Sequence, residues 1–191
     1  MIRAAFLGLA ISMLPAQLAA LNHAGAEIAP LIRVPNESRP WPLSGSALVH
    51  RSFIPFYGLA LYAPLGTVNG AEDMAAGLTP LQITLVWYAN TLPKAQVDEH
   101  FRKQFEQVTD ADTLARIASR IDKFLAVLPA AERGKRITIL YTPDGGAKVD
   151  VEGGKSAHIA GIEFNRALLS IWLGPNADPN VREALKTPPS A

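Results

Sequence analysis

Three short runs of alternating residues in the second half of the chain follow one another with only turn residues between them. The runs cover residues 136–141, 147–152 and 157–160. The first turn is Pro143–Gly146, which contains Asp-Gly, and the second contains Gly153-Gly154. Asp-Gly and Gly-Gly between alternating runs are typical of hairpins. The pattern therefore predicts an antiparallel meander.

Two earlier segments also have strand character. Residues 81–88 alternate, so one face is expected to carry Leu81, Ile83, Leu85 and Trp87. The aromatic and branched stretch from Ala47 to Pro64 is long enough for two strands or for one bent strand, with Pro55 or Gly58 marking the break.

Apolar residues with a helical period follow this strand. One helix is expected after a cap at Asn90 or Thr91, and its apolar stripe consists of Val97, Phe101, Phe105 and Val108. A second begins near Asp110 or Asp112 and ends at Pro129. Residues 162–173 predict a third helix, and Asp178 caps a short last one. One-sided stripes need an apolar surface to cover, so the expected class is α+β: an antiparallel sheet covered on one face by helices.

The first 26 residues resemble a secretory signal peptide. They contain one charge, Arg3, then an apolar run from Ala4 to Leu14 and an Ala-x-Ala site at Ala24–Ala26. Cleavage is expected after Ala26 or, alternatively, near Ala20, and an uncleaved membrane anchor is the other interpretation. The run is too short to span a bilayer, and no second apolar stretch of spanning length follows. The prediction is a periplasmic or secreted protein without a membrane span after cleavage.

The remaining chain divides into two parts. Residues 27–44 contain four prolines and are expected to form an irregular N-terminal arm. Residues 45–187 are expected to form the single folded domain. Removing residues 1–26 takes away one of the 18 basic residues and none of the 17 acidic ones, so the mature charge is 17 minus 17, or zero.

Several classes of function are disfavoured by composition. The chain has no cysteine, which excludes disulfides, thiolate metal sites and a cysteine nucleophile. Its near-zero charge disfavours a nucleic-acid partner. The histidines have no metal-ligand spacing, and the glycine pairs lie in hairpin turns, so neither a metal nor a cofactor is expected. The oligomeric state is left open.

The remaining candidates are polar and aromatic side chains on strands. Strand parity places Arg51, Phe53 and Tyr57 on one face, provided that Pro55 does not shift the register. Arg51 is the only Arg or Lys between Trp41 and Gln82. Its guanidinium matches a carboxylate, and the alternative is an arginine that extends to solvent at the sheet edge.

Four segments together resemble the bacterial chalcone isomerase-like family. They are FYGLALYAP at residues 56–64, LQITLVWYANTL at 81–92, ERGKRITILYTPDGGAKV at 132–149 and HIAGIEFNRALLSIWLG at 158–174. The last is the most specific. The resemblance implies an open-faced β-sandwich, an antiparallel sheet with a helical layer that encloses an apolar cleft.

The resemblance also implies which residues an enzyme of this family would use. A strand arginine, a tyrosine, an asparagine and hydroxyl groups perform the cyclisation in the plant enzymes. Here the candidates are Arg51, Tyr57, Tyr88 and Ser170, but Arg51 is offset from the family's Gly-x-Arg, and the helix at residues 97–108 contains no tyrosine or asparagine. Cyclisation requires a positioned cation and hydrogen-bond donors, and most of these are missing.

Three functional hypotheses follow. The leading one is an exported, non-catalytic protein that binds a small apolar or amphipathic ligand, such as a fatty acid, between sheet and helices. Its expected ligand-binding residues are Arg51, Phe53, Tyr57, Tyr88 and Ser170. The second is an intramolecular lyase of the chalcone isomerase type. The third is a scaffold that binds another envelope protein, in which the aromatic residues belong to the core or to an interface.

Overall fold

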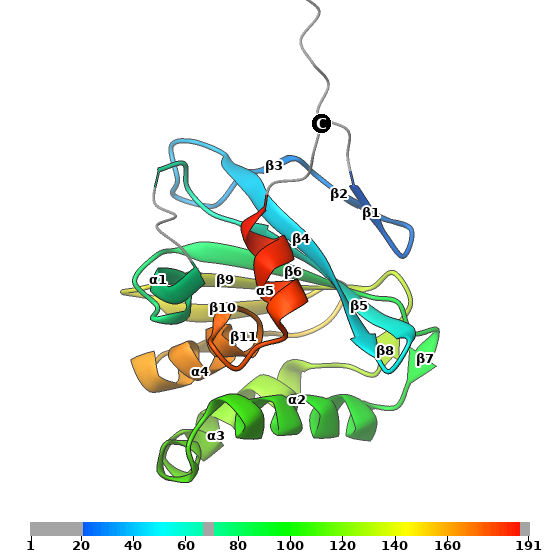
Figure 1. Ribbon diagram of the computed structural model, residues 1–191, viewed down its shortest axis with the longest axis vertical. Helices are drawn as coiled ribbons and strands as arrows, with labels where there is room; N and C mark the ends of the chain where they lie inside the picture. Colours follow the sequence, from blue (N-terminus) through cyan, green and yellow to red (C-terminus); the bar gives the residue numbers. More distant parts are fainter. Residues whose placement is uncertain (1–20, 67–70, 188–191) are drawn as a thin grey trace, which may run out of the picture.

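A curved antiparallel sheet forms the centre of the computed structural model, which describes residues 21–66 and 71–187 (Figure 1). Neighbouring strands follow the order β11-β10-β9-β6-β5-β4-β3, and every pairing is antiparallel. The strands are β3 (Leu31–Ile32), β4 (Trp41–Arg51), β5 (Ile54–Tyr62), β6 (Leu81–Trp87), β9 (Arg136–Thr142), β10 (Gly146–Val151) and β11 (Ser156–Ile159). The meander predicted from the turn residues is β9-β10-β11.

Helices cover one face of this sheet, as Figure 1 shows for α2, α3 and α4. The bounds are α1 (Ala71–Ala75), α2 (Lys94–Val108), α3 (Ala111–Val127), α4 (Ile162–Leu173) and α5 (Pro179–Lys186). Asp110 caps α3 by accepting a hydrogen bond from the Thr113 amide at 2.9 Å. The α+β class with helices on one face is therefore confirmed.

The first long helix begins later than the sequence predicts. Thr91 and Leu92 form the short strand β7, which pairs with β8 (Ala131–Glu132), and α2 starts at Lys94 after Pro93 without a side-chain cap. Because Pro93 occupies the N-cap position, Asn90 and Thr91 lie too far upstream to cap α2. The β7–β8 pairing lies at one end of the main sheet (Figure 1).

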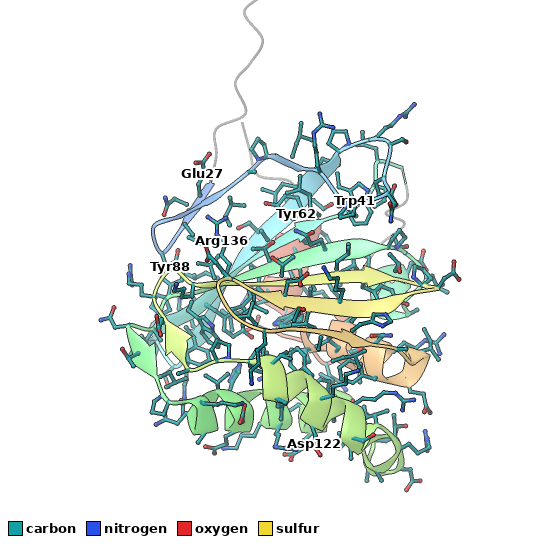
Figure 2. All side chains as sticks on the ribbon, turned by 180° about the vertical axis from the view of Figure 1, so that it is seen from behind. Glu27, Trp41, Tyr62, Tyr88, Asp122 and Arg136 are labelled. Carbon is teal, nitrogen blue, oxygen red and sulfur yellow. The ribbon has the colours of Figure 1, made fainter. Side chains whose placement is uncertain are left out.

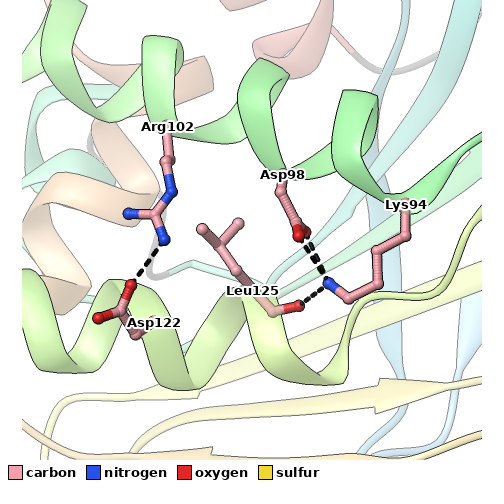
Figure 3. A network of polar contacts seen from close by, with 5 residues as sticks. All are labelled: Lys94, Asp98, Arg102, Asp122 and Leu125. Atoms are coloured by element: carbon pink, nitrogen blue, oxygen red, sulfur yellow. Dashed lines mark hydrogen bonds and ion pairs between the residues drawn. The ribbon is translucent and has the colours of Figure 1, made fainter.

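Apolar stripes, rather than ion pairs, hold the helices to the sheet. In α2 the buried residues are Val97, Phe101 and Phe105, and the predicted β6 face (Leu81, Ile83, Leu85 and Trp87) lies in the same core. Figure 3 shows the polar contacts at the surface between α2 and α3: Arg102 pairs with Asp122 at 2.7 Å, and Lys94 donates to the Leu125 carbonyl at 2.8 Å. Exposed pairs of this kind contribute little, from about zero to 1 kcal/mol each.

The N-terminal part of the chain covers the other face of the sheet. Strands β1 (Leu21–His23) and β2 (Ala26–Ile28) form a hairpin, and a second apolar core joins this segment to the outer face of β5 and β6. In Figure 2, Trp41 and Tyr62 lie on this side, away from Asp122 on α3. Residues 27–44, expected to be irregular, thus contain strand residues in β2, β3 and β4. Pro42 is compatible with β4 because it lies near the start of the strand, opposite the two-residue edge strand β3.

Two glycines permit close approaches that shape this architecture. A Cβ at Gly45 would lie 2.2 Å from the carbonyl oxygen of Leu185, so α5 packs directly on the backbone of β4. A Cβ at Gly58 would lie 2.5 Å from the His23 ring, so the β1 strand rests on β5 at that point. Both positions require the absence of a side chain because the opposing groups are in contact with the sheet backbone.

The β4–β5 connection decides where the predicted site residues lie. The chain turns at Ser52 and Phe53, and Ser52 has a φ of 59°, as the first central residue of a type II′ turn requires. A bulge follows, because Val49 pairs with Tyr57 whereas His50 pairs with Pro55. Of the two predicted alternatives, the segment forms two strands, but the break lies at Ser52 and Phe53 and not at Pro55 or Gly58, which both lie within β5. The turn and the bulge break the parity that placed Arg51, Phe53 and Tyr57 on one face.

Candidate functional site

The space between the sheet and the helices is filled with aromatic side chains. Phe101 of α2 stacks on Tyr57 with ring centroids 6.4 Å apart and meets Phe124 of α3 edge-on at 5.5 Å. Trp172 of α4 donates its indole N–H to the Tyr57 hydroxyl at 3.0 Å. These four side chains are at most 1% exposed. The family resemblance predicts a ligand cleft here, but the side chains pack this region as a core.

A hollow of about 590 Å³ instead lies at the end of the sheet. It is formed by three segments that are distant in sequence: the β4–β5 hairpin, the chain between β6 and β7, and the turn after β8. Its lining residues are Arg51, Ile54, Pro55, Phe56, Tyr88, Ala89, Asn90, Leu92 and Arg133. Apolar groups make up most of the wall. Its volume lies within the range of about 300–1,000 Å³ that is usual for sites of small molecules.

Two exposed arginines border this hollow. Arg133 donates to the Tyr88 carbonyl at 3.0 Å, and its guanidinium lies 5.5 Å from the centroid of the Tyr88 ring. Within the described part of the chain, Arg51 has no ion pair. No acidic side chain is among the described lining residues. The hollow therefore combines an apolar wall with a guanidinium that forms no ion pair in the described chain and whose donors match an anionic group, with Glu99 of α2 within range of its charge.

His100 of α2 lies behind the hollow. Its ring packs edge-on against Phe56, which lines the hollow, with centroids 4.8 Å apart, and lies 5.8 Å from the ring of Tyr57. Its Nε2 atom is buried without a hydrogen-bond partner among the described residues. Burial, and to a lesser extent the charge of Arg51, lowers the pKa of His100 to about 4, so the imidazole is neutral at pH 7.

Lowering the pH from 6.5 to 4 is expected to decrease the free energy of unfolding. His100 has an ordinary pKa of 6.5 in the unfolded chain and a pKa of about 4 in the folded one, so only the unfolded chain takes up this proton within the window. Above pH 6.5, His100 is neutral in both the folded and the unfolded chain, so its contribution to the free energy of unfolding no longer changes with pH. Urea unfolding at pH 7.5 and 4.5 measures the decrease, and His100→Gln should reduce it.

The control for this experiment is His50→Gln, which removes an exposed histidine and tests whether the effect is specific to His100. His23 remains in both variants, and burial also lowers its pKa, so part of the dependence should persist. An equal pH dependence in wild type and His100→Gln would contradict the buried, neutral state of His100.

The structure distributes the predicted site residues over four environments. Arg51 and Tyr88 line the same hollow. Phe53 is 98% exposed in the hairpin turn, and Tyr57 is buried in the core, where burial raises its pKa. Ser170 on α4 is half-buried and lines a different hollow. Only Arg51 and Tyr88 are brought together.

The hollow beside Ser170 is a weaker candidate for an anionic ligand. It measures about 620 Å³, lies between α1, α4 and α5, and is bordered by Arg166, Arg182 and Lys186. Each of these cations already has a partner: Arg166 donates to the Ala76 carbonyl at 2.8 Å, Arg182 donates to backbone carbonyls, and Lys186 forms an ion pair. Two acidic residues of α1 also line it.

Several residues of the first hollow are not among those that the sequence predicts. Arg133 lies in an irregular turn, where no periodicity assigns a direction to its side chain. Leu92 is expected to lie beside a helix cap but lines the hollow. Phe56 also lines the hollow, because the bulge changes the direction of its side chain. The one sequence signal for Arg133 is its place in the segment at residues 132–149, which is part of the family resemblance.

No group of three or more His, Asp or Glu side chains that could hold a metal ion occurs in the described ranges. The helices of the described chain are all too short or too polar to cross a bilayer.

Comparisons with known proteins identify a family and a solved structure of similar fold. A family model described as chalcone isomerase-like matches residues 20–186. Among solved structures, a fatty-acid binding protein of Arabidopsis thaliana matches with a TM-score of 0.64 and 17% identity. That match covers 88% of this chain and 96% of the other. At this identity the likeness concerns the fold. No curated protein matches the chain significantly.

Proposed function

The chain belongs to the chalcone isomerase-like family, and we propose that it is a non-catalytic protein that binds an apolar carboxylate, such as a fatty acid. The observation that carries this proposal is the hollow at the end of the sheet, where an apolar wall adjoins Arg51, which forms no ion pair with the described residues. A carboxylate would accept hydrogen bonds from the guanidinium, and the acyl chain would lie against Ile54, Phe56 and Leu92.

The solved structure of similar fold supports the choice of ligand. That protein's name describes it as fatty-acid binding, and it shares the architecture over most of both chains. Because the identity is 17%, the ligand comes to this chain as a proposal that rests on the hollow itself.

The alternative of ring closure has less support from the geometry. A lyase would need Arg51, Tyr57, Tyr88 and Ser170 around one substrate, since acid–base and electrostatic groups act within hydrogen-bonding distance. Tyr57 is buried and already accepts a hydrogen bond from Trp172, and Ser170 lines another hollow. Only two of the four groups face the candidate site.

Native mass spectrometry with palmitate tests the binding proposal. Arg51→Ala is expected to raise the dissociation constant about tenfold or more, because a charge-assisted hydrogen bond contributes about 1.5–3 kcal/mol. Arg133→Ala should also weaken binding, since Arg133 borders the same hollow. Palmitate methyl ester, which lacks the charge, should bind wild type and Arg51→Ala equally.

The matched control is Arg102→Ala, which removes an exposed arginine from the outer surface of α2 and should leave palmitate binding unchanged. Absence of palmitate uptake by the wild-type protein would refute the proposal. Uptake that neither Arg51→Ala nor Arg133→Ala weakens would place the ligand outside this hollow.

The proposal extends to export from a bacterial cell into the periplasm or the medium. It is supported by the apolar run after Arg3, which lies outside the described residues. The hairpin of β1 and β2 packs on the sheet and includes residues 21–26. We therefore favour cleavage near Ala20, which keeps this hairpin, over cleavage after Ala26, which would remove its first strand.

A further inference from the structure

The tip of the β4–β5 hairpin carries two adjacent apolar side chains in solvent. Phe53 is 98% exposed and Ile54 is 72% exposed. Other exposed large apolar residues of the described chain, such as Leu31, Leu65 and Leu78, occur singly. Scattered apolar residues are normal on a protein surface, whereas an adjacent pair at a protruding turn indicates a contact.

The backbone of the turn does not explain these side chains. Ser52 occupies the position with positive φ, which is the conformational requirement of the turn. Phe53 follows it and contributes to neither of the two apolar cores. A polar residue would fit the backbone conformation of the turn equally well, so neither the turn nor the packing of the cores requires an aromatic ring at this position.

The charges beside the tip are basic. Ile54 lines the hollow together with Arg51 and Arg133, and no acidic side chain is among the described lining residues. On α2, Glu99 forms an ion pair with Lys103 at 2.7 Å, and its pKa is lowered mainly by Lys103 and to a lesser extent by the charge of Arg51. The apolar tip is thus flanked by two guanidinium groups, neither of which forms an ion pair within the described chain.

We propose that this tip docks on an anionic lipid surface, with Phe53 and Ile54 at the level of the upper acyl chains and the two arginines among the headgroups. Aromatic rings and arginines are favoured at these depths. A protein partner is less compatible with the shape, since a stable protein interface buries about 800 Å² on each side and two side chains supply a small part of that. A bilayer needs no complementary pocket.

Docking in this orientation also places the hollow against the membrane. Ile54 belongs to both the tip and the hollow wall, so an acyl chain that leaves the bilayer enters the hollow directly. This route for the ligand rests on the proposed function, whereas docking itself does not require it.

Vesicle co-sedimentation without added fatty acid tests the docking. Wild-type protein should bind vesicles of phosphatidylcholine containing phosphatidylglycerol, and binding should weaken in pure phosphatidylcholine and at high salt. Phe53→Ser should lower the partition coefficient at least about tenfold. Leu78→Ser is the matched control, because Leu78 is 64% exposed elsewhere on the surface and its replacement should leave binding unchanged.

A second variant reports insertion directly. The native tryptophans are buried, so the fluorescence of Phe53→Trp should shift to shorter wavelength when anionic vesicles are added. Absence of this shift, or vesicle binding equally lowered by Leu78→Ser, would overturn the proposal. A self-association that Phe53→Ser abolishes, without vesicle binding, would assign the tip to a protein contact instead. Vesicle binding without palmitate uptake would refute only the proposed ligand.

Discussion

Phe101→Ala is expected to lower the free energy of unfolding by about 3–5 kcal/mol, the usual cost of removing a buried aromatic ring. Phe101 is 1% exposed and lies between the sheet and the helices, where its ring meets those of Tyr57, Trp87, Phe124 and Trp172. Urea denaturation measures the loss. Glu106→Ala, an exposed change on the same helix, should alter the stability by no more than about 0.5 kcal/mol.

This experiment distinguishes a core from a ligand cleft between sheet and helices. In a core, Phe101→Ala destabilises the protein strongly, and palmitate binding at the end of the sheet persists under conditions in which the variant is folded. In a loosely filled cleft, the stability changes little and the enlarged space alters ligand affinity. The second outcome would contradict the site proposed at Arg51.

A chain that begins at Leu21 is expected to be more stable than one that begins at Glu27 by about 2–3 kcal/mol. Residues 21–26 supply strand β1, the buried Ala26 and the half-buried His23. His23 contacts the Ser46 hydroxyl at 2.7 Å and the Tyr88 hydroxyl at 3.2 Å. Each hydrogen bond contributes about 1 kcal/mol, and the shorter chain also exposes apolar surface.

Urea denaturation of the two chains, each produced without residues 1–20, measures this difference. His23→Ala in the longer chain separates the two side-chain contacts from the rest of the hairpin and should show an intermediate stability. Equal stabilities would contradict the structural role of the hairpin. N-terminal sequencing of the exported protein then identifies the cleavage point, and a mature chain starting at Glu27 would refute cleavage near Ala20.

Much of the fold could be predicted because its signals are local. The alternation in β6 and the apolar stripes of α2 and α3 indicate which side chains face inward. The turn residues indicate where the strands of the meander end. The N-terminal layer was not predicted, because strands of two or three residues are too short to show a period. The β7–β8 pair was missed for the same reason.

The candidate site was predicted only in part, and Arg51 illustrates why. Its isolation among apolar residues indicated a special role, and it does line a hollow. The residues that line the hollow with it could not be predicted, because a two-residue turn and a bulge give the side chains of Phe53 and Tyr57 other directions than that of Arg51. Each inserted residue reverses the face of every side chain that follows, so parity cannot be extended across such a connection.

The sequence by itself determined the class of fold, the inward faces of the long elements and the family, since periodicity and motif spacing are properties of contiguous residues. Only the tertiary structure decided that aromatic rings fill the space between sheet and helices, and that the hollow lies at the end of the sheet. The physical reason is that a cavity is what remains after side chains from distant segments have packed. Arg51, Tyr88 and Arg133 meet there through strand register and turn geometry.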